Sequence, residues 1–379
     1  MIYLVLSLDY EIFGKGAGDV MRDVIEPTNR LLSICDKHGA KMTIMFEVGE
    51  YWAFEQYASQ LRKNLGYSPY EQMKRQAIDA IRRGHDVQLH LHPQWIGANY
   101  DQGLWQLCDS YWRLADLPGG LGSKSQITSI TGALHAGKET LENMIKPVKA
   151  DYECVCFRAG GFYAQPSENI ISAMKKVGLR ADSSVVKGYK TSTPFEVDYS
   201  HVKTDKAAWW TTYTELTAEG KSGENIFELS ISSRVQPYWK NFKKTKLRAA
   251  LKRRHAERAS HGNHTTDRDI SSVPNCRTMM KRLLRNCPST FDFCKLSSRD
   301  MLRRTKEHAK HPEQPIVMIG HSKDFVNDRE FDKFLASLCK NENVSFQSMS
   351  DYVRQAFNIF GISSSGKTGY VGLGLSGAK

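Results

Sequence analysis

The stretch Leu4–Glu11, with the sequence LVLSLDYE, is an apolar run that ends in two carboxylates. Three further apolar runs end in polar side chains in the same way: Asp86–Leu89 before His90 and His92, Val155–Phe157 before Arg158, and Ile316–Gly320 before His321. Buried parallel strands have continuous apolar runs of this kind. In a barrel of such strands, the side chains that follow the strands meet at one mouth.

Helical patterns separate the apolar runs, and glycines that suit helix ends follow them at Gly39, Gly84 and Gly178. Strand alternating with helix implies parallel strands joined by crossover helices. Polar groups follow several strands rather than one, which favours a closed or nearly closed barrel over an open sheet. No glycine-rich phosphate loop follows the first strand, and this argues against a dinucleotide site.

The length of 379 residues fits one large α/β domain with insertions, or two smaller domains. The alternating pattern breaks between residues 236 and 299, where we expect an insertion with a basic helix near Asn241–Arg258. From Ser363 onward the chain is rich in glycine and serine, as flexible tails are. We therefore expect a single domain over residues 1–362, with the insertion at 236–299, and a flexible tail over residues 363–379.

The formal net charge of +12 is concentrated in this insertion. Its basic side chains, opposed only by Glu257, are Lys240, Lys243, Lys244, Lys246, Arg248, Lys252, Arg253, Arg254 and Arg258. A solvated helix face is the simplest interpretation. With Tyr238 and Trp239 beside it, the segment also suits weak contact with an anionic membrane surface, which is our preferred hypothesis. Nucleic acid is a less favoured partner, because no module that reads nucleic acid accompanies the charge.

The eight cysteines are scattered without a Cys-x-x-Cys pair, which indicates reduced thiols in a cytosolic protein. Asp9 interrupts the apolar N-terminus before it reaches the length of a signal peptide. No stretch approaches the roughly 20 apolar residues that span a bilayer. We expect a cytoplasmic protein that can be peripheral to the inner membrane.

The strand ends carry groups that can bind a metal. Because alternate residues of a strand face one side, Asp9 and Glu11 point the same way, and so do His90 and His92. Two carboxylates and two imidazoles suit Zn²⁺, with Co²⁺ and Fe²⁺ as alternatives. Each pair alone would be better explained as a surface acidic pair or as backbone-bonded histidines. All four together, with Arg158 and His321, favour a site.

These residues in this order resemble the polysaccharide deacetylase family, carbohydrate esterase family 4. The family has five short motifs, and the stretches similar to them are Ser7–Glu11, Gly84–His90, Phe157–Phe162, Asp182–Ser184 and Ile319–His321. Thr43–Phe46 also looks like the family's second strand. The resemblance covers roughly residues 1–186 and 315–352. It implies a distorted (β/α) barrel of seven or eight strands, with the basic helical insertion before the last barrel strands.

The chain departs from the family's pattern at three places. Tyr10 separates the two acids, which are adjacent in the family. Gln94 stands where the family's second histidine is expected, so His92 is the substitute. The arginine motif continues as Ala159-Gly160-Gly161 instead of Pro-Pro-Tyr. These departures indicate a divergent branch with an altered substrate, or a member that has lost activity.

The resemblance implies a role for each residue in a metal-dependent hydrolase that removes an acyl group from an N-acylated amino sugar. Glu11, His90 and His92 would hold the metal. Asp9 would take the proton of the attacking water, or would exchange this role with Glu11.

Three further groups complete the implied mechanism. Arg158 would orient the base, and a backbone N–H near Gly161–Phe162 would stabilise the oxyanion. His321 would protonate the leaving amine, and Asp182 would keep His321 charged.

The implied setting is surface-polysaccharide biosynthesis, with an amino sugar or a lipid-linked glycan as substrate. Two alternatives stay open. The first is a catalytically silent barrel that binds glycan or acts as a scaffold in a biosynthetic complex. The second is an amidohydrolase that acts on a small non-sugar amide.

Overall fold

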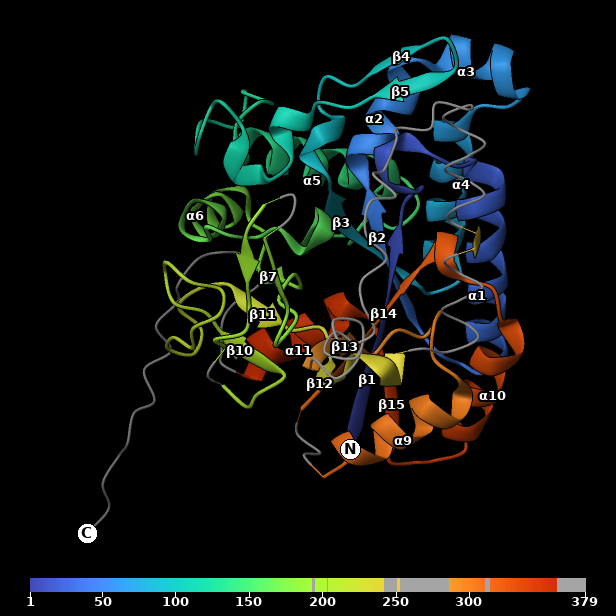
Figure 1. Ribbon diagram of the computed structural model, residues 1–379, viewed down its shortest axis with the longest axis vertical. Coiled ribbons are helices and arrows are strands. Elements are labelled where there is room, and N and C mark those ends of the chain that lie inside the picture. The colour runs from blue at the N-terminus through green and yellow to red at the C-terminus, as the bar shows by residue number, and fades with distance from the viewer. Residues whose placement is uncertain (193–194, 203, 242–250, 253–285, 311–313, 360–379) are drawn as a thin grey trace, which may run out of the picture.

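The computed structural model describes residues 1–192, 195–202, 204–241, 251–252, 286–310 and 314–359. Its main feature is a nine-stranded sheet with the strand order β10-β11-β7-β6-β3-β2-β1-β14, with β15 also paired to β1 (Figure 1). The strands are β1 (Ile2–Tyr10), β2 (Met42–Glu47), β3 (Asp86–Leu91), β6 (Cys156–Ala159), β7 (Ala181–Asp182), β10 (Ala208–Trp210), β11 (Phe227–Leu229), β14 (Ile316–His321) and β15 (Val344–Gln347). All neighbouring pairs are parallel except β10 and β11.

Helices connect the strands and cover the sheet (Figure 1). They are α1 (Glu26–Lys37), α2 (Val48–Gln56), α3 (Ala58–Leu65), α4 (Pro69–Arg82), α5 (Ile130–Ile145), α6 (Glu168–Val177), α9 (Ser298–His308), α10 (Asp328–Leu338) and α11 (Met349–Ile359). The predicted glycine stops are confirmed: Gly39, Gly84 and Gly178 have φ values of 64°, 82° and 79° just after α1, α4 and α6. In the described part of the chain, three two-stranded sheets lie outside the main sheet; they are β4 (Asn99–Asp101) with β5 (Leu104–Gln106), β8 (Lys190–Thr191) with β9 (Val197–Asp198), and β12 (Ser233–Pro237) with β13 (Asn286–Thr290).

The segment that follows β11 reaches β14 at the opposite end of the sheet. Ile231, just after β11, pairs in parallel with Val186, and the next residue, Ser232, reaches β14. There the N–H of Ser232 donates to the carbonyl of Val317 at 2.9 Å, and the N–H of Val317 donates to Ser232 Oγ at 3.1 Å. The fold is therefore mixed α/β with a curled, mostly parallel sheet, which is consistent with the predicted distorted barrel.

Alternation along the strands separates the two faces of the sheet. Leu4, Leu6 and Leu8 of β1 join the larger core, which packs against the helices. Val5 joins a second core with Met45, Val317 and the α11 residues Met349, Val353 and Phe357. The amino end of α11 is fixed to the sheet, because the N–H of Met349 donates to Thr43 Oγ1 at 2.8 Å. Apolar side chains therefore fill the space inside the curl at this end, and the polar residues collect at the carboxyl ends of the strands.

The predicted insertion at 236–299 differs from the structure at its second end. Residues 286–290 form β13, and Asp292 pairs in parallel with Ile319 of β14. Phe291 and Phe293 are buried in the larger core, so this part belongs to the barrel wall. The predicted basic helix at 241–258 falls almost wholly outside the described residues, and the predicted tail at 363–379 falls wholly outside them.

Among the described residues, no helix combines the length and the apolar character needed to cross a membrane. Seven cysteines lie in the described part of the chain, and all seven are free thiols.

Candidate metal centre

Strand register brings the polar strand ends together. Asp9 of β1 lies directly opposite His321 of β14. On the other side of β1, Glu47 of β2 lies opposite His90 of β3, and His90 lies opposite Arg158 of β6. These five side chains therefore stand at the carboxyl ends of five adjacent strands, where the strand-end pattern predicts a site.

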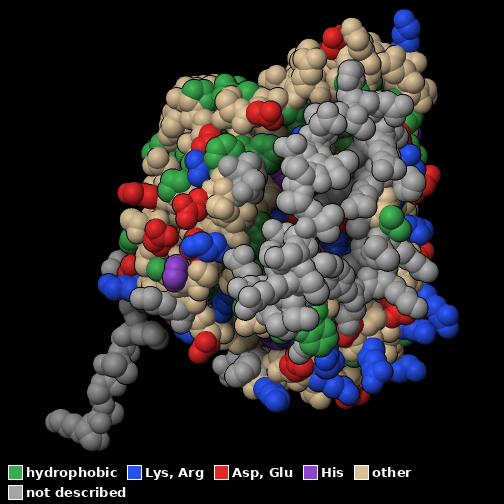
Figure 2. All heavy atoms as spheres, in the orientation of Figure 1, with side chains coloured by type: hydrophobic (Ala, Val, Ile, Leu, Met, Phe, Trp, Pro, Cys, Tyr) green, Lys and Arg blue, Asp and Glu red, His purple; other side chains and the backbone are tan. Residues whose placement is uncertain are grey.

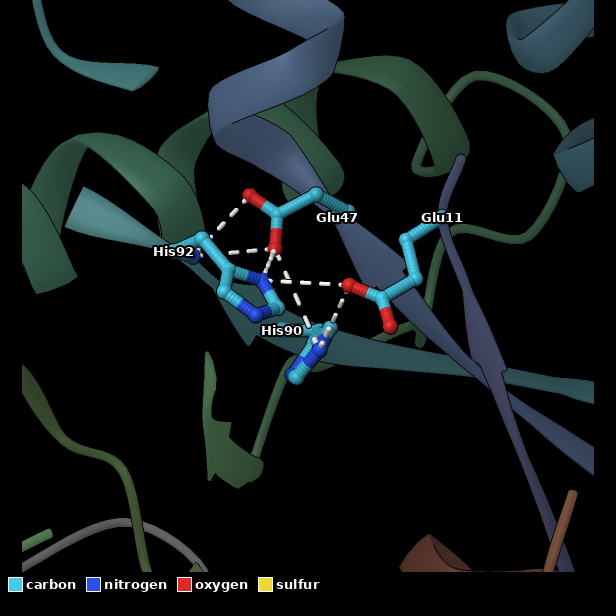
Figure 3. Close-up of side chains that lie close together, drawn as sticks. All are labelled: Glu11, Glu47, His90 and His92. Atoms are coloured by element: carbon cyan, nitrogen blue, oxygen red, sulfur yellow. Dashed lines mark hydrogen bonds and ion pairs between the residues drawn. The ribbon is translucent and has the colours of Figure 1, made fainter. Parts of the chain in front are cut away.

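Glu11, Glu47, His90 and His92 form a group whose potential ligand atoms all lie within 4.8 Å of one another (Figure 3). Glu11 Oε2 is 3.7 Å from His90 Nε2 and 3.2 Å from His92 Nδ1. Glu47 Oε2 is 3.9 Å and 2.8 Å from the same two nitrogens. Two carboxylates and two imidazoles are a sufficient set of ligands for a divalent transition metal. The group can therefore bind a metal ion.

The hydrogen bonds of His90 fit a ligand role. Its Nδ1 lies 2.9 Å from the carbonyl oxygen of Arg158, which acts only as an acceptor, so Nδ1 carries a proton. Its Nε2 is buried and has no hydrogen-bond partner among the described residues. Metal-ligating histidines have a backbone carbonyl on one ring nitrogen in the same way, and the opposite nitrogen of His90 faces the carboxylates of Glu11 and Glu47.

Burial lowers the pKa of His90, but the charges of Asp9, Glu11 and Glu47 outweigh burial and raise this pKa to about 9. Without a metal, His90 is therefore protonated near neutral pH. A metal ion would have to displace this proton from Nε2.

Glu47, the last residue of β2, binds the backbone at the start of α2 and just after β3. Its Oε1 accepts a hydrogen bond from the N–H of Gly49 at 2.9 Å and so caps the amino end of α2. Its Oε2 accepts from the N–H of His92 at 2.9 Å and lies 2.8 Å from His92 Nδ1. Sequence reasoning missed Glu47, although it ends an apolar strand as Asp9 and His90 do.

Glu11 is held from the opposite side by Lys323, which follows β14. Lys323 Nζ donates to Glu11 Oε1 at 2.8 Å and to the carbonyl of Ile12 at 2.6 Å. Burial raises the pKa of Glu11, but Lys323 and the two histidines lower it by more than burial raises it. The net pKa therefore lies well below its ordinary value. Glu11 is therefore ionised, with Oε1 on the lysine and Oε2 facing the histidines.

Asp9 and Arg158 form a buried ion pair beside this group. The guanidinium also donates to the carbonyl of Ser183 at 2.8 Å, to Ser7 Oγ at 2.9 Å and to Ser183 Oγ at 3.0 Å. Burial raises the pKa of Asp9, but the charge of Arg158 and the nearby histidines lowers it below the ordinary value. The second oxygen, Oδ2, lies 3.5 Å from Nε2 of His321, whose own pKa is lowered by burial.

The structure does not bring Asp182 to His321. Asp182 accepts hydrogen bonds from the N–H of Ser184 at 2.7 Å and from Ser184 Oγ at 2.9 Å, and it interacts with Glu228 of β11. The carboxylates whose charge acts on His321 are Asp9, Asp324 and Glu11. Burial raises the pKa of Asp182. The expected role of Asp182, to keep His321 charged, therefore has no contact to support it in the described part of the chain.

Comparisons with known proteins complete the description. No family model matches the chain, and no curated protein matches it. One similar solved structure is a "putative polysaccharide deacetylase" from Mycobacterium smegmatis, with 12% identity over 95% of this chain and 91% of that chain and a TM-score of 0.45. Another is a 4-alpha-glucanotransferase from Thermococcus litoralis, with 12% identity over 93% of this chain and 38% of that chain and a TM-score of 0.43. These values are too low to identify a family.

Proposed function

We propose that this chain is a metal-dependent hydrolase that removes the acyl group from an N-acylated amino sugar. The observation that carries the proposal is the group of Glu11, Glu47, His90 and His92, which lies beside the Asp9–Arg158 pair. The choice of substrate rests on the ordered motifs at these residues, which resemble polysaccharide deacetylases. An amino sugar or a lipid-linked glycan of surface-polysaccharide assembly is the substrate we propose, with the enzyme on the cytoplasmic side of the membrane.

Glu11, His90 and His92 would hold the metal, with Glu47 as a fourth ligand. Nε2 of buried His90 supports this assignment, because it makes no hydrogen bond among the described residues, which is costly for a buried nitrogen, and it faces the carboxylates of Glu11 and Glu47. The donor set suits Zn²⁺, and it also suits Co²⁺ or Fe²⁺. A divalent ion there would polarise the carbonyl under attack and make water more acidic.

Asp9 and His321 would handle the protons. Arg158 fixes Asp9 Oδ1, so Oδ2 remains to take a proton from the attacking water as the new C–O bond forms. His321 Nε2, 3.5 Å from that oxygen, would take this proton from Asp9 and give it to the nitrogen as the C–N bond breaks. A swap of roles between Asp9 and Glu11 is the alternative. Because Glu11 belongs to the group of potential metal ligands and Asp9 does not, we assign the base to Asp9.

The first test is the metal content of protein purified without chelator. We expect near-stoichiometric metal in the wild type and in His201→Ala, whose exposed ring lies on the β8–β9 side of the fold. The double variant His90→Ala/His92→Ala should contain none. Asp9→Asn should keep the metal and lose turnover, and equal metal loss in Asp9→Asn and Glu11→Gln would refute the division of roles.

A screen of acyl-amino sugars against small non-sugar amides, both at matched metal content, then tests the substrate. Release of acetate from an N-acetyl amino sugar supports the proposal. Turnover of the small amides alone would make the chain a different amidohydrolase.

A silent barrel that binds glycan is the second candidate. Hydrogen bonds inside the group favour it, because Lys323 already neutralises Glu11 and Glu47 already binds His92. If neither the wild type nor the double variant takes up Zn²⁺ or Co²⁺, the hydrolase proposal fails and the silent barrel replaces it.

A further inference from the structure

A pocket lies between β12 and α9. It has a volume of about 190 Å³ and is lined by Ser232, Ser233, Arg234, Phe291, Arg304, Glu307 and His308. Ser232 meets β14 at Val317, four residues before His321, which is about 13 Å along the strand at 3.3 Å per residue. The pocket is therefore separate from the candidate metal centre.

Arg304 is the unusual member of this pocket. Its side chain is 4% exposed, and it donates to the carbonyls of Ser289 and Thr290 at 3.0 and 2.8 Å and to Ser289 Oγ at 2.9 Å. All these acceptors are neutral. Its Nε has no hydrogen-bond partner, and no carboxylate lies within ion-pair distance of it, among the residues that the structure describes. A buried guanidinium that lacks both a partner for Nε and an ion pair costs free energy of folding, and a bound anion would remove this cost.

The other charged groups make the pocket positive. Arg234 lies near Arg304, and its positive charge helps burial to lower the pKa of Arg304 to about 10. Glu307 is the one carboxylate among the described residues that line the pocket, and its Oε2 lies 3.3 Å from Arg234 Nη1. Two guanidinium groups against one carboxylate leave a net positive charge, even when His308 is neutral. Figure 2 shows further Lys and Arg side chains along the lower edge of the molecule, where Figure 1 places α9 and α10.

The size and chemistry of the pocket select the ligand. Pockets that hold a whole cofactor or drug-sized molecule have about 300–1,000 Å³, so 190 Å³ suits a single group rather than a whole sugar nucleotide. One arginine guanidinium can bind a phosphate group through two parallel hydrogen bonds. A dianionic phosphate also matches the positive charge better than a carboxylate does.

We propose that this pocket is a binding site for the phosphate group of a phosphate ester. Arg304 and Arg234 bind its oxygens, and the ring of Phe291, over which the Arg304 guanidinium lies at 5.7 Å, forms an apolar wall. Glu307 opposes the anion and limits its affinity. The site does not depend on the proposed hydrolase activity.

Calorimetric titration with inorganic phosphate at constant ionic strength tests the site. The full chain carries His90→Ala/His92→Ala and is kept in chelator, so that phosphate cannot bind through a metal. In this background, Arg234→Gln should bind phosphate about tenfold more weakly, through loss of one charged hydrogen bond. Glu307→Gln should bind about fivefold more tightly, through loss of a repulsive charge. Arg62→Gln, which removes an exposed arginine of α3 paired with Glu71, is the control and should bind as the parent does.

Phosphate affinity should change in opposite directions in Arg234→Gln and Glu307→Gln. This result distinguishes a specific binding site from general attraction to basic residues. Affinity that is the same in all variants, or that falls equally in Arg62→Gln, would overturn the proposal, and so would no binding at all. Competition then identifies the source of the phosphate. Displacement by a soluble sugar phosphate assigns a soluble ester, and displacement only by short-chain phosphatidic acid assigns a lipid headgroup. Both outcomes support the phosphate site.

Discussion

Removal of the Arg158 guanidinium should destabilise the fold more than removal of any exposed charge. The side chain is 0% exposed and donates four hydrogen bonds, one of them to buried Asp9. Arg158→Met leaves the Asp9 carboxylate buried without its cation, and one-sided loss of a buried ion pair costs about 3–5 kcal/mol. Asp9→Asn leaves the guanidinium buried without its anion and should cost a similar amount.

The double variant Arg158→Met/Asp9→Asn removes both charges, so it should cost less than the sum of the single variants. For groups in direct contact we expect a coupling energy of about 2–3 kcal/mol. Urea unfolding at pH 7 in chelator, followed by circular dichroism, measures the four free energies of unfolding without a contribution from metal binding. Arg62→Met is the matched control. It breaks an exposed pair with Glu71 at 3.0 Å and should cost less than about 1 kcal/mol.

The reasoning fails if the costs of the single variants add to within about 0.5 kcal/mol, which is the behaviour of independent sites. It also fails if Arg158→Met lowers the free energy of unfolding no more than the Arg62→Met control does. Either result would mean that Asp9 and Arg158 do not depend on each other in the folded protein.

Three further outcomes follow from the structure. Gly160→Ala should weaken metal binding in a Zn²⁺ titration, because a Cβ at Gly160 would overlap the His92 ring, whereas Gly14→Ala, with nothing within 4 Å, should not. Glu47→Gln should also weaken Zn²⁺ binding, and unchanged affinity would remove Glu47 from the ligand set. Burial holds the pKa of His85 below its ordinary 6.5, and its Nδ1 accepts from a backbone N–H, so the unfolded state binds the proton first as pH falls. The free energy of unfolding should therefore drop below pH 6.5, by up to about 1.4 kcal/mol per pH unit, and His85→Asn should make this slope shallower.

Much of the candidate site could be predicted from the positions of residues along strands. Asp9, Glu11, His90 and His92 lie at alternate positions just where apolar runs end, and the alternation and the parallel order together brought them to one edge. Glu47 was missed because it stands alone between a strand and a helix. A single glutamate at such a position is explained by its role as a helix cap.

Two other parts could not be predicted because they depend on strand pairing across long separations. β7 has only two residues, so its length does not show which neighbour its polar end faces, and Asp182 turned to Ser184 and Glu228. The segment around Phe291 and Phe293 is mostly polar, so its sequence does not indicate a buried strand. Its partner, β14, comes later in the chain. Neither pairing leaves a local pattern.

The position of β1 in the sheet has a consequence for the order of folding. β1 pairs with β14 and β15, which are synthesised more than 300 residues after it. Asp9 therefore meets His321 only after this long intervening segment has been made, whereas β2 and β3 can pair much earlier. Such long-range contacts slow folding and leave strand edges exposed meanwhile. The nascent chain should thus need protection of the open edge of β1 until β14 and β15 have been synthesised.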